Sequence, residues 1–340
     1  MARSIYGLDL GTYEIKVYDK KQDSTWKEKS AIAIVDGKNI LAVGDEAYAM
    51  FERTPENIQV VFPMKEGVIS RFTDMQYLLQ NLLKKEHRFA RGAEYLISVP
   101  TDITEVEKRA FFDLVVHSTA KAKEVNIIER GVAQCVGIGI DVRKTKGVLI
   151  VDFGAATTEL SIVGSGGMLL NKMLKIGGTT FDVSVMNLIR RKYDFLIGQQ
   201  TAERIRKRFG ISAGKNNTSM VVAGRNLVAG VPRYQEIPSS VVRTAMKESL
   251  ETILTQIDFL LERTPPEVAR AVQENGIYLT GGVAVLPGLA RYIEARTGHR
   301  VHVAPKPDLC AVEGLHRMTD SKELKQLSYS MLDENYRWIR

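Results

Sequence analysis

The sequence predicts an α/β protein made of two related halves, and three observations support this fold class. Apolar and polar residues alternate along 4–19 and again along 148–163, each time around a turn that contains glycine, which predicts two β-hairpins. Apolar residues recur at helical spacing elsewhere in the chain. The first strand of both hairpins ends in Asp-x-Gly, as Asp9-Leu10-Gly11 and Asp152-Phe153-Gly154. Because the hairpins lie nearly half the chain apart, we expect two lobes that face each other across a cleft.

Helices are expected in the segments between and after the hairpins. The segment 74–85 places four leucines along one stripe, and the longest helix is expected at about 240–263, where a pair of prolines ends it. Another helix is expected to begin at residue 101, because Asp102 and Glu105 have the spacing of a capping box.

The length and composition predict a globular, cytoplasmic protein of two compact units or one deeply cleft molecule. The chain has 340 residues, a formal net charge of +7 and 44% hydrophobic residues, which argues against a disordered or collagen-like chain. No apolar run approaches the ~20 residues that a membrane span needs. Residues 1–20 alternate like a strand and lack the apolar core of a signal peptide. Cys135 and Cys310 have no metal-type spacing and are expected to be reduced thiols in the core.

The positive charge is densest in two short runs, 190–192 and 204–208. Both lie in segments with a helical pattern, so they are interpreted as solvated helix faces; an acidic polymer or an anionic lipid surface is the alternative. The sequence contains no zinc-finger spacing and no aromatic-basic motif of an RNA-binding sheet, so no nucleic-acid partner is expected.

The two Asp-x-Gly turns have the chemistry needed to hold a nucleoside triphosphate. A glycine lets backbone N–H groups approach phosphate oxygens closely, and nearby Thr hydroxyls add donors. A carboxylate at the strand end can hold Mg²⁺ through water, and the metal then bridges the phosphates. We therefore expect Asp9 and Asp152 to be the residues that face the metal. The alternative is that both turns are ordinary capped hairpins.

A third segment has the features of a nucleoside site. The apolar strand 277–280 runs into Gly281-Gly282, and a helix follows from about residue 287. Such a turn allows a ring or a ribose to lie against the backbone. In the segment 201–206, Glu203 and Arg206 share one helix face and could bracket a nucleoside, although the pair taken by itself is interpreted as a surface ion pair.

Further blocks of sequence extend the pattern beyond the turns. These blocks are 7–12, 42–47, 53–58, 63–69, 99–100 with 103–110, 223–228 and 279–282. In this order they resemble the family of the bacterial rod-shape-determining protein MreB, within the actin-like ATPase superfamily. Other members of the superfamily share the phosphate loops but not the intervening blocks, so the resemblance, which spans residues 5–314, is specific to the MreB family.

The resemblance implies an actin-like fold, with two duplicated, ribonuclease-H-like lobes that each carry a smaller subdomain and a nucleotide cleft between them. The implied subdomains are IA (1–31 and 74–144, with 315–340 packing back), IB (32–73), IIA (145–181 and 245–314) and IIB (182–244).

The same resemblance implies ATP and Mg²⁺ as ligands and a set of residues around them. The implied nucleotide-binding residues are Asp9, Gly11, Thr12, Tyr13, Glu14, Gly154, Ala155, Ala156, Thr157, Gly177, Gly178, Glu203, Arg204, Ile205, Arg206, Gly281, Gly282, Val283 and Ala284. The residues placed at the reacting phosphate are Glu129, Arg130, Asp152 and Thr158. The resemblance further implies head-to-tail filaments of this chain on the inner face of the cell membrane, together with wall-synthesis membrane proteins, in a role that sets rod shape.

Two departures from the family pattern concern the nucleotide. Ala155 and Ala156 stand where the family has glycines, and their Cβ atoms narrow the space beside a phosphate. Arg130 stands where the family has a glutamate that orients the attacking water; an arginine stays charged and cannot accept a proton. We therefore expect slow or absent hydrolysis, unless Glu129 takes over by a small shift in register. The rival classes are a non-polymerising, nucleotide-gated adaptor and a small-molecule kinase.

Two further departures concern the membrane. No basic amphipathic helix precedes Ile5, so the expected contact is the loop 87–92, in which Phe89 lies between arginines. An ordinary polar loop is the alternative. The tail after residue 314 has apolar residues at roughly helical spacing (Leu324, Leu327, Met331 and Trp338). We expect this tail to pack back on the body rather than to contact lipid.

Overall fold

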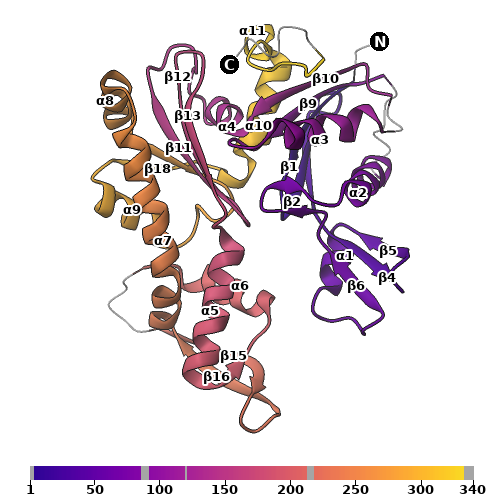
Figure 1. Cartoon of the computed structure of the whole chain (residues 1–340), viewed down its shortest axis with the longest axis vertical. Helices are drawn as coiled ribbons and strands as arrows, with labels where there is room; N and C mark the ends of the chain where they lie inside the picture. The colour runs from indigo at the N-terminus through magenta and orange to yellow at the C-terminus, as the bar shows by residue number, and fades with distance from the viewer. Residues whose placement is uncertain (1–3, 86–91, 119–120, 213–217, 333–340) are drawn as a thin grey trace. The chain divides into compact units, whose positions relative to one another are not determined.

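The computed structural model describes residues 4–85, 92–118, 121–212 and 218–332 (Figure 1). The chain divides into two compact units. Unit 1 comprises Met1–Lys146, Ser161–Lys172 and Leu309–Arg340, and unit 2 comprises Gly147–Leu160 and Met173–Asp308. The finer division into four subdomains stays a prediction.

The main sheet of unit 1 has five strands in the order β10-β9-β1-β2-β3. They are β1 (Ile5–Leu10), β2 (Glu14–Asp19), β3 (Ser24–Lys29), β9 (Glu94–Val99) and β10 (Glu124–Glu129). The first three are antiparallel neighbours, and β1, β9 and β10 run parallel. The hairpin predicted over residues 4–19 is therefore confirmed.

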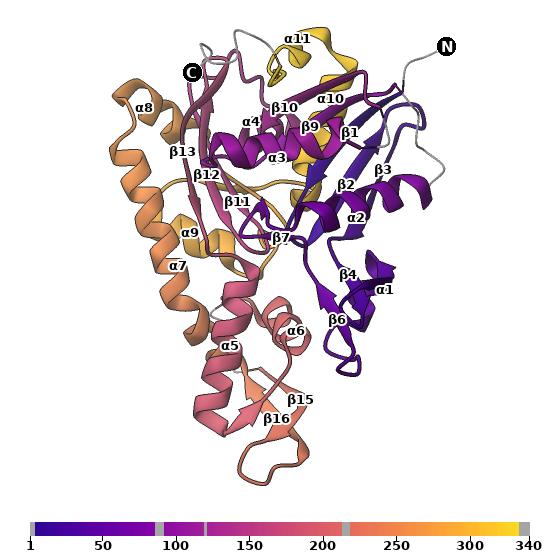
Figure 2. The same cartoon turned by 45° about the vertical axis from the view of Figure 1, so that its right-hand side comes forward.

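Helices cover both faces of this sheet (Figure 2). On one face lie α2 (Phe72–Lys85) and α3 (Glu105–Val116), packed on the inward residues Tyr6, Leu8 and Leu10 of β1. On the other lie α4 (Arg130–Gly137) and α10 (Cys310–Asp320), where a Cβ added to Gly7 would lie 2.9 Å from the Cβ of Leu315. Because side chains alternate along a strand, Asp9 shares the α4 and α10 face with Gly7.

Two glycines let α4 and α10 cross at backbone contact. A Cβ added to Gly314 would lie 1.8 Å from the carbonyl oxygen of Ala133, and one added to Gly137 would lie 2.0 Å from that of Cys310. No side chain fits at either position without moving a helix. The crossing therefore fixes where the first residue of α4, Arg130, meets the sheet.

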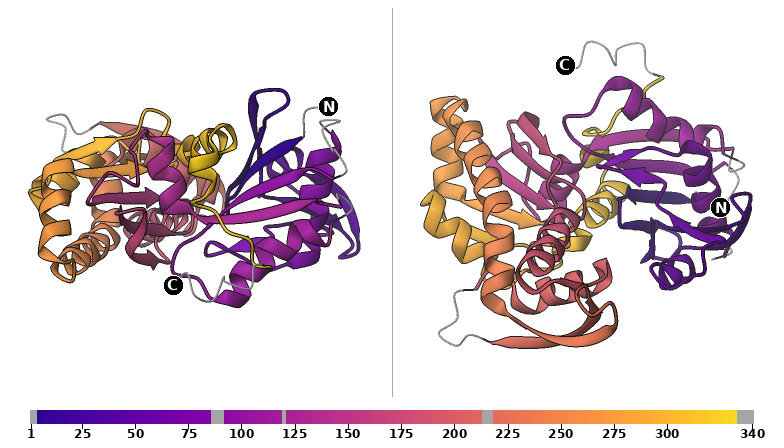
Figure 3. Two further views of the ribbon diagram at one scale, coloured as in Figure 1. Left: turned by 90° about the horizontal axis from the view of Figure 1, so that it is seen from above. Right: turned by 60° about the horizontal axis from the view of Figure 1, so that its bottom comes forward.

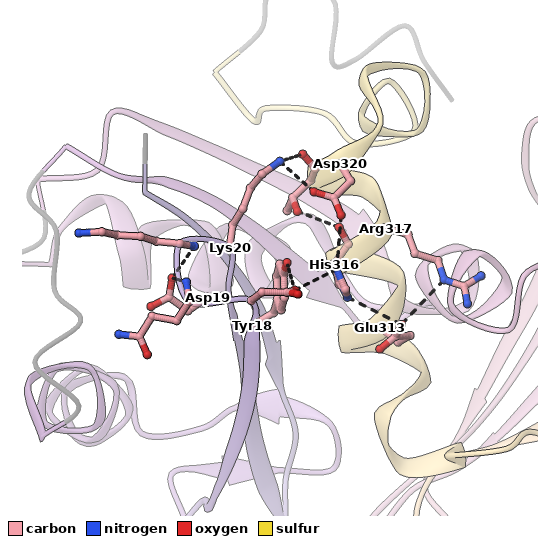
Figure 4. A network of polar contacts seen from close by, with 11 residues as sticks. Tyr18, Asp19, Lys20, Glu313, His316, Arg317 and Asp320 are labelled. Atoms are coloured by element: carbon pink, nitrogen blue, oxygen red, sulfur yellow. Dashed lines mark hydrogen bonds and ion pairs between the residues drawn. The ribbon is translucent and has the colours of Figure 1, made fainter. Parts of the chain in front are cut away.

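A polar cluster joins α10 to the end of β2 (Figure 4). The rings of Tyr18 and His316 are stacked with centroids 4.2 Å apart. Asp320 lies 3.3 Å from Nε2 of His316, and its other carboxylate oxygen lies 3.0 Å from Nζ of Lys20. The Tyr18 hydroxyl donates to Asp23 at 3.0 Å. Burial and the neighbouring Asp23 raise the pKa of Tyr18, so this phenol remains a donor.

A smaller sheet completes unit 1. Its elements are β4 (Ile32–Val35), β5 (Asn39–Val43), β6 (Ile58–Val61) and α1 (Asp45–Met50), with the two-stranded ribbon β7 (Met64–Lys65) and β8 (Val68–Ile69). Small residues fill the space between this sheet and α1, since Ala31, Ala33 and Ala47 are completely buried.

The second five-stranded sheet repeats the strand order of the first, as β13-β12-β11-β17-β18. Its strands are β11 (Val148–Phe153), β12 (Thr158–Gly164), β13 (Gly167–Leu174), β17 (Ile277–Thr280) and β18 (Val301–Val303). As in unit 1, two parallel strands follow the strand that carries the aspartate. The pair β11 and β12 confirms the hairpin predicted over 148–163, and the repeated order confirms the predicted duplication.

Helices and a small sheet make up the rest of unit 2. The helices are α5 (Gly178–Tyr193), α6 (Gln199–Phe209), α7 (Ser239–Glu262), α8 (Pro266–Asn275) and α9 (Leu289–Thr297), and the small sheet is β14 (Phe195–Leu196), β15 (Ser219–Asn226) and β16 (Pro232–Pro238). α5 packs against both α6 and α7 (Figures 1 and 3). The long helix predicted at about 240–263 is α7.

One prediction about local structure is wrong. α3 begins at Glu105, and its capping box is made by Thr104 and Glu107, whereas Asp102 has a left-handed backbone and its carboxylate lies 3.0 Å from Lys172. In the described part of the tail, the short helix α11 (Lys322–Lys325) follows α10, and Tyr329 then pairs with Ile127 as an isolated β-bridge. Tyr329 and Met331 do pack on the core of unit 1, as expected of a tail that folds back.

Three further predictions concern the cysteines, helices that could span a membrane and the expected membrane contact. Cys135 and Cys310 are free, buried thiols as expected, and burial raises the pKa of Cys135 to about 12. Among the residues that the structure describes, no helix combines the length and apolar character needed to cross a bilayer. The Phe89 loop and Trp338 lie outside the described residues.

Candidate functional site

Each unit contains one of the two Asp-x-Gly turns, and the first is built around Asp9 at the end of β1. Asp9 is only 5% exposed, and it lies opposite Ser98 of the parallel strand β9. The Ser98 hydroxyl donates to Oδ1 of Asp9 at 2.8 Å. On the antiparallel side, Asp9 lies opposite Lys16 of β2, whose Nζ is 3.4 Å from Oδ2. The carboxylate is therefore held from both neighbouring strands.

A third donor reaches Asp9 from α4. Nε of Arg130 lies 3.4 Å from Oδ1 of Asp9, and its Nη2 donates to the carbonyl oxygen of Leu10 at 3.2 Å. Burial alone would raise the pKa of Asp9, but the charges of Lys16 and Arg130, together with the Ser98 hydroxyl, outweigh it and hold that pKa below its ordinary value. The turn thus holds an ionised aspartate between two cations.

The turn after Asp9 needs its glycine. The Gly11 N–H donates to the carbonyl oxygen of Glu14 at 3.1 Å, and a Cβ added to Gly11 would lie 2.7 Å from that oxygen. Thr12 accepts a hydrogen bond from the N–H of Gly67 at 3.2 Å. Tyr13 and Glu14 contact other elements, since the Tyr13 hydroxyl lies 3.3 Å from that of Tyr48 and Glu14 is paired with Lys29.

Glu129, the alternative to Arg130 near the reacting phosphate, lies on the other face of the sheet from Asp9. Its carboxylate accepts from the hydroxyl of Tyr329 at 2.8 Å and lies 3.8 Å from Nζ of Lys108 on α3. Ile127, two residues earlier on the same face, is completely buried in the core beneath α2 and α3. A one-residue change in register would be needed to bring Glu129 to the Asp9 face.

The second turn, in unit 2, is built around Asp152 at the end of β11. Asp152 is 7% exposed and lies opposite Thr280 of the parallel strand β17, whose hydroxyl donates to Oδ1 at 3.5 Å. The Gly154 N–H donates to the carbonyl oxygen of Thr157 at 2.9 Å, which repeats the bond made by Gly11 in the first turn. In both turns, therefore, an aspartate ends a strand, accepts from a hydroxyl of the neighbouring parallel strand and precedes a glycine whose N–H is bonded within the turn.

Gly281 brings the third predicted segment against this turn. It has a φ of +83°, and a Cβ added there would lie 2.3 Å from the carbonyl oxygen of Phe153 and 2.4 Å from Oδ1 of Asp152. No atoms lie within 4 Å of the corresponding position on Gly282. The N–H of Val283 donates to the same carbonyl oxygen of Phe153 at 3.0 Å, and Ala284 is buried behind it.

The N-terminus of α5 closes over the second turn. The N–H groups of Gly178 and Thr179 donate to the carbonyl oxygens of Gly154 and Ala155 at 3.1 and 2.7 Å. A Cβ added to Gly177 would lie 2.7 Å from that oxygen of Ala155, and 2.8 Å from the carbonyl carbon of Ala156. The Thr158 hydroxyl donates to the carbonyl oxygen of Ile176 at 2.7 Å, which holds it toward the backbone.

The helix α6 contributes the side chain of Arg206 to the surroundings of the second turn. Its partner differs from Glu203, which the sequence predicted. Arg206 is 4% exposed and forms a two-pronged pair with Asp182 of α5, at 2.6 and 3.2 Å. A Cβ added to Gly178 would lie 3.1 Å from Nη2 of Arg206. The interpretation of Glu203 and Arg206 as a surface ion pair is wrong, because Asp182, which is distant in sequence, holds the guanidinium while Glu203 pairs with Lys207. Burial raises the pKa of Asp182, an effect that Arg206 opposes.

The structure therefore gathers part of the predicted set in each unit. Unit 1 brings together Asp9, Gly11 and Arg130, and unit 2 brings together Asp152, Gly154, Ala155, Ala156, Gly177, Gly178, Arg206, Gly281 and Val283. Thr157 is 6% exposed beside this second group, Ile205 lies in the core and Arg204 is exposed. That these residues bind a nucleotide stays a prediction.

Four residues that the sequence reasoning did not select also belong to these groups. They are Lys16, Ser98, Asp182 and Thr280. Of these, only Lys16 has a local signal, because a short turn after Asp9 places it directly opposite on the next strand.

The described contacts of the two aspartates bear on whether they can face a metal. Both oxygens of Asp9 are engaged, Oδ1 by Ser98 and Arg130 and Oδ2 by Lys16, and this surrounding is cationic. Asp152 accepts from an uncharged hydroxyl. Three donors therefore already occupy lone-pair positions of Asp9, and fewer positions remain for the water shell of a metal.

Comparison with known proteins places the chain among actin-like proteins. The family model described as MreB/Mbl protein matches residues 3–327. The cell shape-determining protein MreB of Escherichia coli (strain K12) is 37% identical over 316 residues, which cover 90% of this chain and 90% of that protein. The crystal structure of MreB 5 of Spiroplasma citri bound to AMPPNP matches with a TM-score of 0.90 at 30% identity, over 96% of this chain and 99% of that one.

A more distant structure shares the fold alone. The MamK double helical filament matches with a TM-score of 0.79 at 20% identity, over 94% of this chain and 99% of that chain. Together with the repeated strand order of the two units, these matches confirm the predicted actin-like fold.

Proposed function

The chain belongs to the MreB/Mbl family, and on this premise we propose that it is an ATP-binding, filament-forming protein that helps to determine rod cell shape. The observation that carries the proposal is the repeated turn. In each unit an aspartate ends a strand, accepts from a hydroxyl on the next parallel strand and precedes a glycine N–H bonded three residues ahead. The relative from Spiroplasma citri has been solved with AMPPNP and with ADP, which supports an adenine nucleotide as the ligand.

The residues proposed to hold the nucleotide follow from the two turns. The backbone of Gly11 and Thr12 in unit 1 and of Gly154, Ala155 and Ala156 in unit 2 would bind phosphate oxygens, because few side-chain atoms stand in the way. The open position beside Gly282 would accept the nucleoside, with Arg206 and Gly178 nearby. Asp9 and Asp152 would hold Mg²⁺ through water, and the ion would neutralise part of the phosphate charge.

Hydrolysis is proposed to be slow. Arg130 has no lone pair to accept a proton from water, and the carboxylate of Glu129 lies on the opposite face of the sheet, held by Tyr329. Phosphate release by the unaltered protein and by Arg130→Glu tests this. Release that is at least ~10-fold faster from the variant supports the proposal, whereas equal and rapid release would show that another group activates the water.

We propose that the chain polymerises and that its filaments lie on the inner face of the cell membrane, where they would organise wall-synthesis membrane proteins. The filament proposal is supported by membership of the family, and the proposed membrane contact is the Phe89 loop. Open filaments arise from head-to-tail contacts that do not close, so one protomer surface must complement another.

Electron microscopy of the purified protein with ATP and Mg²⁺ tests the function as a whole, alongside titration calorimetry with the same nucleotide. Filaments that form with ATP and bind anionic vesicles support the proposal. A protein that binds ATP but forms no filaments would instead be a nucleotide-gated adaptor, a role that the engaged Asp9 and the alanines at 155 and 156 would also suit.

A further inference from the structure

The hairpin formed by β15 and β16 in unit 2 ends in an exposed apolar loop. Residues 227–231 join the two strands and point away from the rest of the unit (Figures 1 and 2). The side chain of Val228 is 83% exposed, and Leu227 and Val231 beside it are also exposed. Neighbouring apolar side chains are unfavourable in water, so such a loop indicates a surface that binds a partner.

The exposed apolar surface continues from the loop along one face of the hairpin. Tyr234 is 79% exposed and lies opposite Ala223, and Val221, two residues earlier on the same face, is exposed as well. The other face packs into unit 2, where Val222 and Ile237 are buried. The hairpin patch is defined here as Val221, Ala223, Leu227, Val228, Val231 and Tyr234.

A run of basic residues lies next to the loop. The N–H of Leu227 donates to the carbonyl oxygen of Asp194 at 2.8 Å, so the loop is bonded to the end of α5. The last turn of α5 contains Arg190, Arg191 and Lys192, and all three are exposed. The apolar loop is therefore held beside three cations and the single carboxylate of Asp194.

Two arginines flank the loop on the strands themselves. Arg225 lies opposite Pro232, Arg233 follows on β16, and both arginines are exposed. The segment 219–235 contains no Asp or Glu, and the carboxylate of Glu236 at its end is bonded to the hydroxyl of Ser219. The hairpin patch thus combines exposed apolar side chains with an excess of positive charge.

We propose that the hairpin patch and the basic residues beside it bind an anionic lipid bilayer, with the apolar loop inserted among the headgroups. This inference rests on the proposed membrane association and gives it a second contact, in unit 2, besides the Phe89 loop. A short apolar loop binds a bilayer weakly by itself, and each basic residue at an anionic surface strengthens the attraction roughly fivefold. Stable binding therefore needs both features, and the hairpin has both.

This combination favours a bilayer over other partners that positive charge attracts. An acidic polymer would be held by the charges alone and would leave the side chains of Val228 and Val231 in water. A second copy of this chain has a formal net charge of +7, so it offers the arginines less negative charge than an anionic bilayer does. Only a bilayer presents negative headgroups directly above an apolar layer.

Flotation of the full-length protein with vesicles of phosphatidylglycerol and phosphatidylcholine tests the apolar contribution. The double variant Val228→Ser with Val231→Ser is expected to bind at least ~10-fold more weakly than the unaltered chain, because it loses the side chains that leave water. Val106→Ser is the matched control, since Val106 is 81% exposed but lies on α3 of unit 1, and its binding should be unchanged. Circular dichroism checks that each variant is folded.

The same assay tests the contribution of charge. Arg233→Gln is expected to weaken binding roughly fivefold on phosphatidylglycerol vesicles and to have no effect on vesicles of phosphatidylcholine alone. Arg270→Gln removes an exposed arginine on α8, at the other end of unit 2, and should leave binding unchanged (Figures 1 and 2). Raised salt should reduce the difference between the two arginine variants, because it screens exposed charges.

A fluorescent probe reports insertion of the loop directly. The two cysteines of the chain, Cys135 and Cys310, are buried, so a nitrobenzoxadiazole group attached to Val228→Cys labels the loop selectively. Its emission is expected to rise at least ~2-fold and shift to the blue on anionic vesicles, because the probe leaves water. The same group on Val106→Cys should not respond.

The outcomes distinguish this inference from the membrane association on which it rests. Vesicle binding that is unchanged in the double variant, with a probe at 228 that stays in water, would overturn the inference and leave the membrane contact to the Phe89 loop, where Phe89→Ser should then abolish binding. A double variant that binds vesicles normally but forms no filaments with ATP would assign the hairpin to contacts between copies and would also overturn it. No binding of the unaltered chain to anionic vesicles, with or without ATP, would remove the membrane association itself.

Discussion

The two Asp-x-Gly turns share their backbone bonds, but the side chains described around their aspartates differ. Asp9 and Asp152 each end a strand opposite a hydroxyl residue of a parallel neighbour, and Gly11 and Gly154 make the same turn bond. Asp9, however, is paired with two cations, whereas Asp152 accepts from Thr280. The repeat thus preserves the backbone turn that is proposed to lie beside a phosphate, whereas the side chains around the aspartate differ between the two turns.

The source of the difference lies outside the turns themselves. Arg130 reaches Asp9 because α4 is held against the sheet by its crossing with α10, at Gly137 and Gly314. In unit 2 the corresponding approach to the turn is made by the backbone of Gly281. One turn is therefore completed by a side chain on a helix and the other by a glycine, and each can be disturbed without the other.

The largest effect is expected from Gly314→Ala, which disturbs the first turn alone. Its Cβ would lie 1.8 Å from the carbonyl oxygen of Ala133, so α4 and α10 must separate and Arg130 must move from Asp9. We expect the free energy of unfolding to fall by about 3 kcal/mol or more, measured by urea denaturation. Gly167→Ala is the matched control, because a Cβ there meets no atom within 4 Å, and it should change stability by less than ~0.5 kcal/mol. Equal stability of the two variants would contradict the close crossing.

Next in size is Asp9→Asn, compared with Asp152→Asn. The first removes the carboxylate charge that lies between the buried side chains of Lys16 and Arg130, and we expect a loss of about 3 kcal/mol in the free energy of unfolding. The second replaces a carboxylate that meets a hydroxyl, and a loss of about 1 kcal/mol is expected. Similar losses for both variants would show that the two turns do not differ in charge as described.

The stability lost in Asp9→Asn is also expected to depend on pH. The pKa of Asp9 is lower in the folded protein than in the unfolded chain, so its contribution to stability is complete above the unfolded value, near 3.8, and is lost as the pH falls through the folded value. The stability advantage of the unaltered protein over Asp9→Asn should therefore be constant from pH 7 to pH 5 and shrink below about pH 4. Urea denaturation at several pH values measures it. An advantage that grew on acidification would have the wrong sign.

A smaller effect is expected from Gly281→Ala, which disturbs the second turn alone. The positive φ and the contact with Phe153 both oppose a Cβ, so we expect a loss of about 2 kcal/mol in the free energy of unfolding and weaker binding of ATP. Gly282→Ala meets no protein atom within 4 Å, so it should keep full stability while weakening ATP binding if the nucleoside lies there. Unchanged binding in Gly282→Ala would move the nucleoside elsewhere.

The sequence predicts local features of this comparison well and the contacts between distant segments poorly. Alternation along 4–19 and 148–163 is enough to predict both hairpins and to place both aspartates at strand ends. Arg130 can be located by counting from the family pattern, but its pairing with Asp9 depends on how α4 packs. Helical spacing predicts a pair of Arg206 with Glu203 on the same helix, whereas Asp182, which pairs with Arg206, comes from another helix.

The tail and the start of α3 show the same limit. Apolar residues after 314 have helical spacing, yet the chain leaves the helix at Lys325 and pairs Tyr329 with Ile127, because an edge strand of the sheet offers backbone partners. The spacing of a capping box fits Asp102 as well as Thr104, since both positions are followed by glutamate three residues later, and the structure forms it at Thr104. In each case two local patterns compete, and tertiary contacts decide between them.

The smallest expected difference concerns the hydroxyl donors, and it sharpens the comparison between the turns. The Ser98 hydroxyl lies 2.8 Å from Asp9, and the Thr280 hydroxyl lies 3.5 Å from Asp152, at the limit of a hydrogen bond. Ser98→Ala should cost about 1.5 kcal/mol, because the bond it removes is short and ends on an ionised carboxylate. Thr280→Val, which keeps the shape of the side chain, should cost about 0.5 kcal/mol for the longer bond. Chemical denaturation at pH 7 resolves the two values, and a larger cost for Thr280→Val would mean that Asp152, rather than Asp9, depends more on its hydroxyl partner.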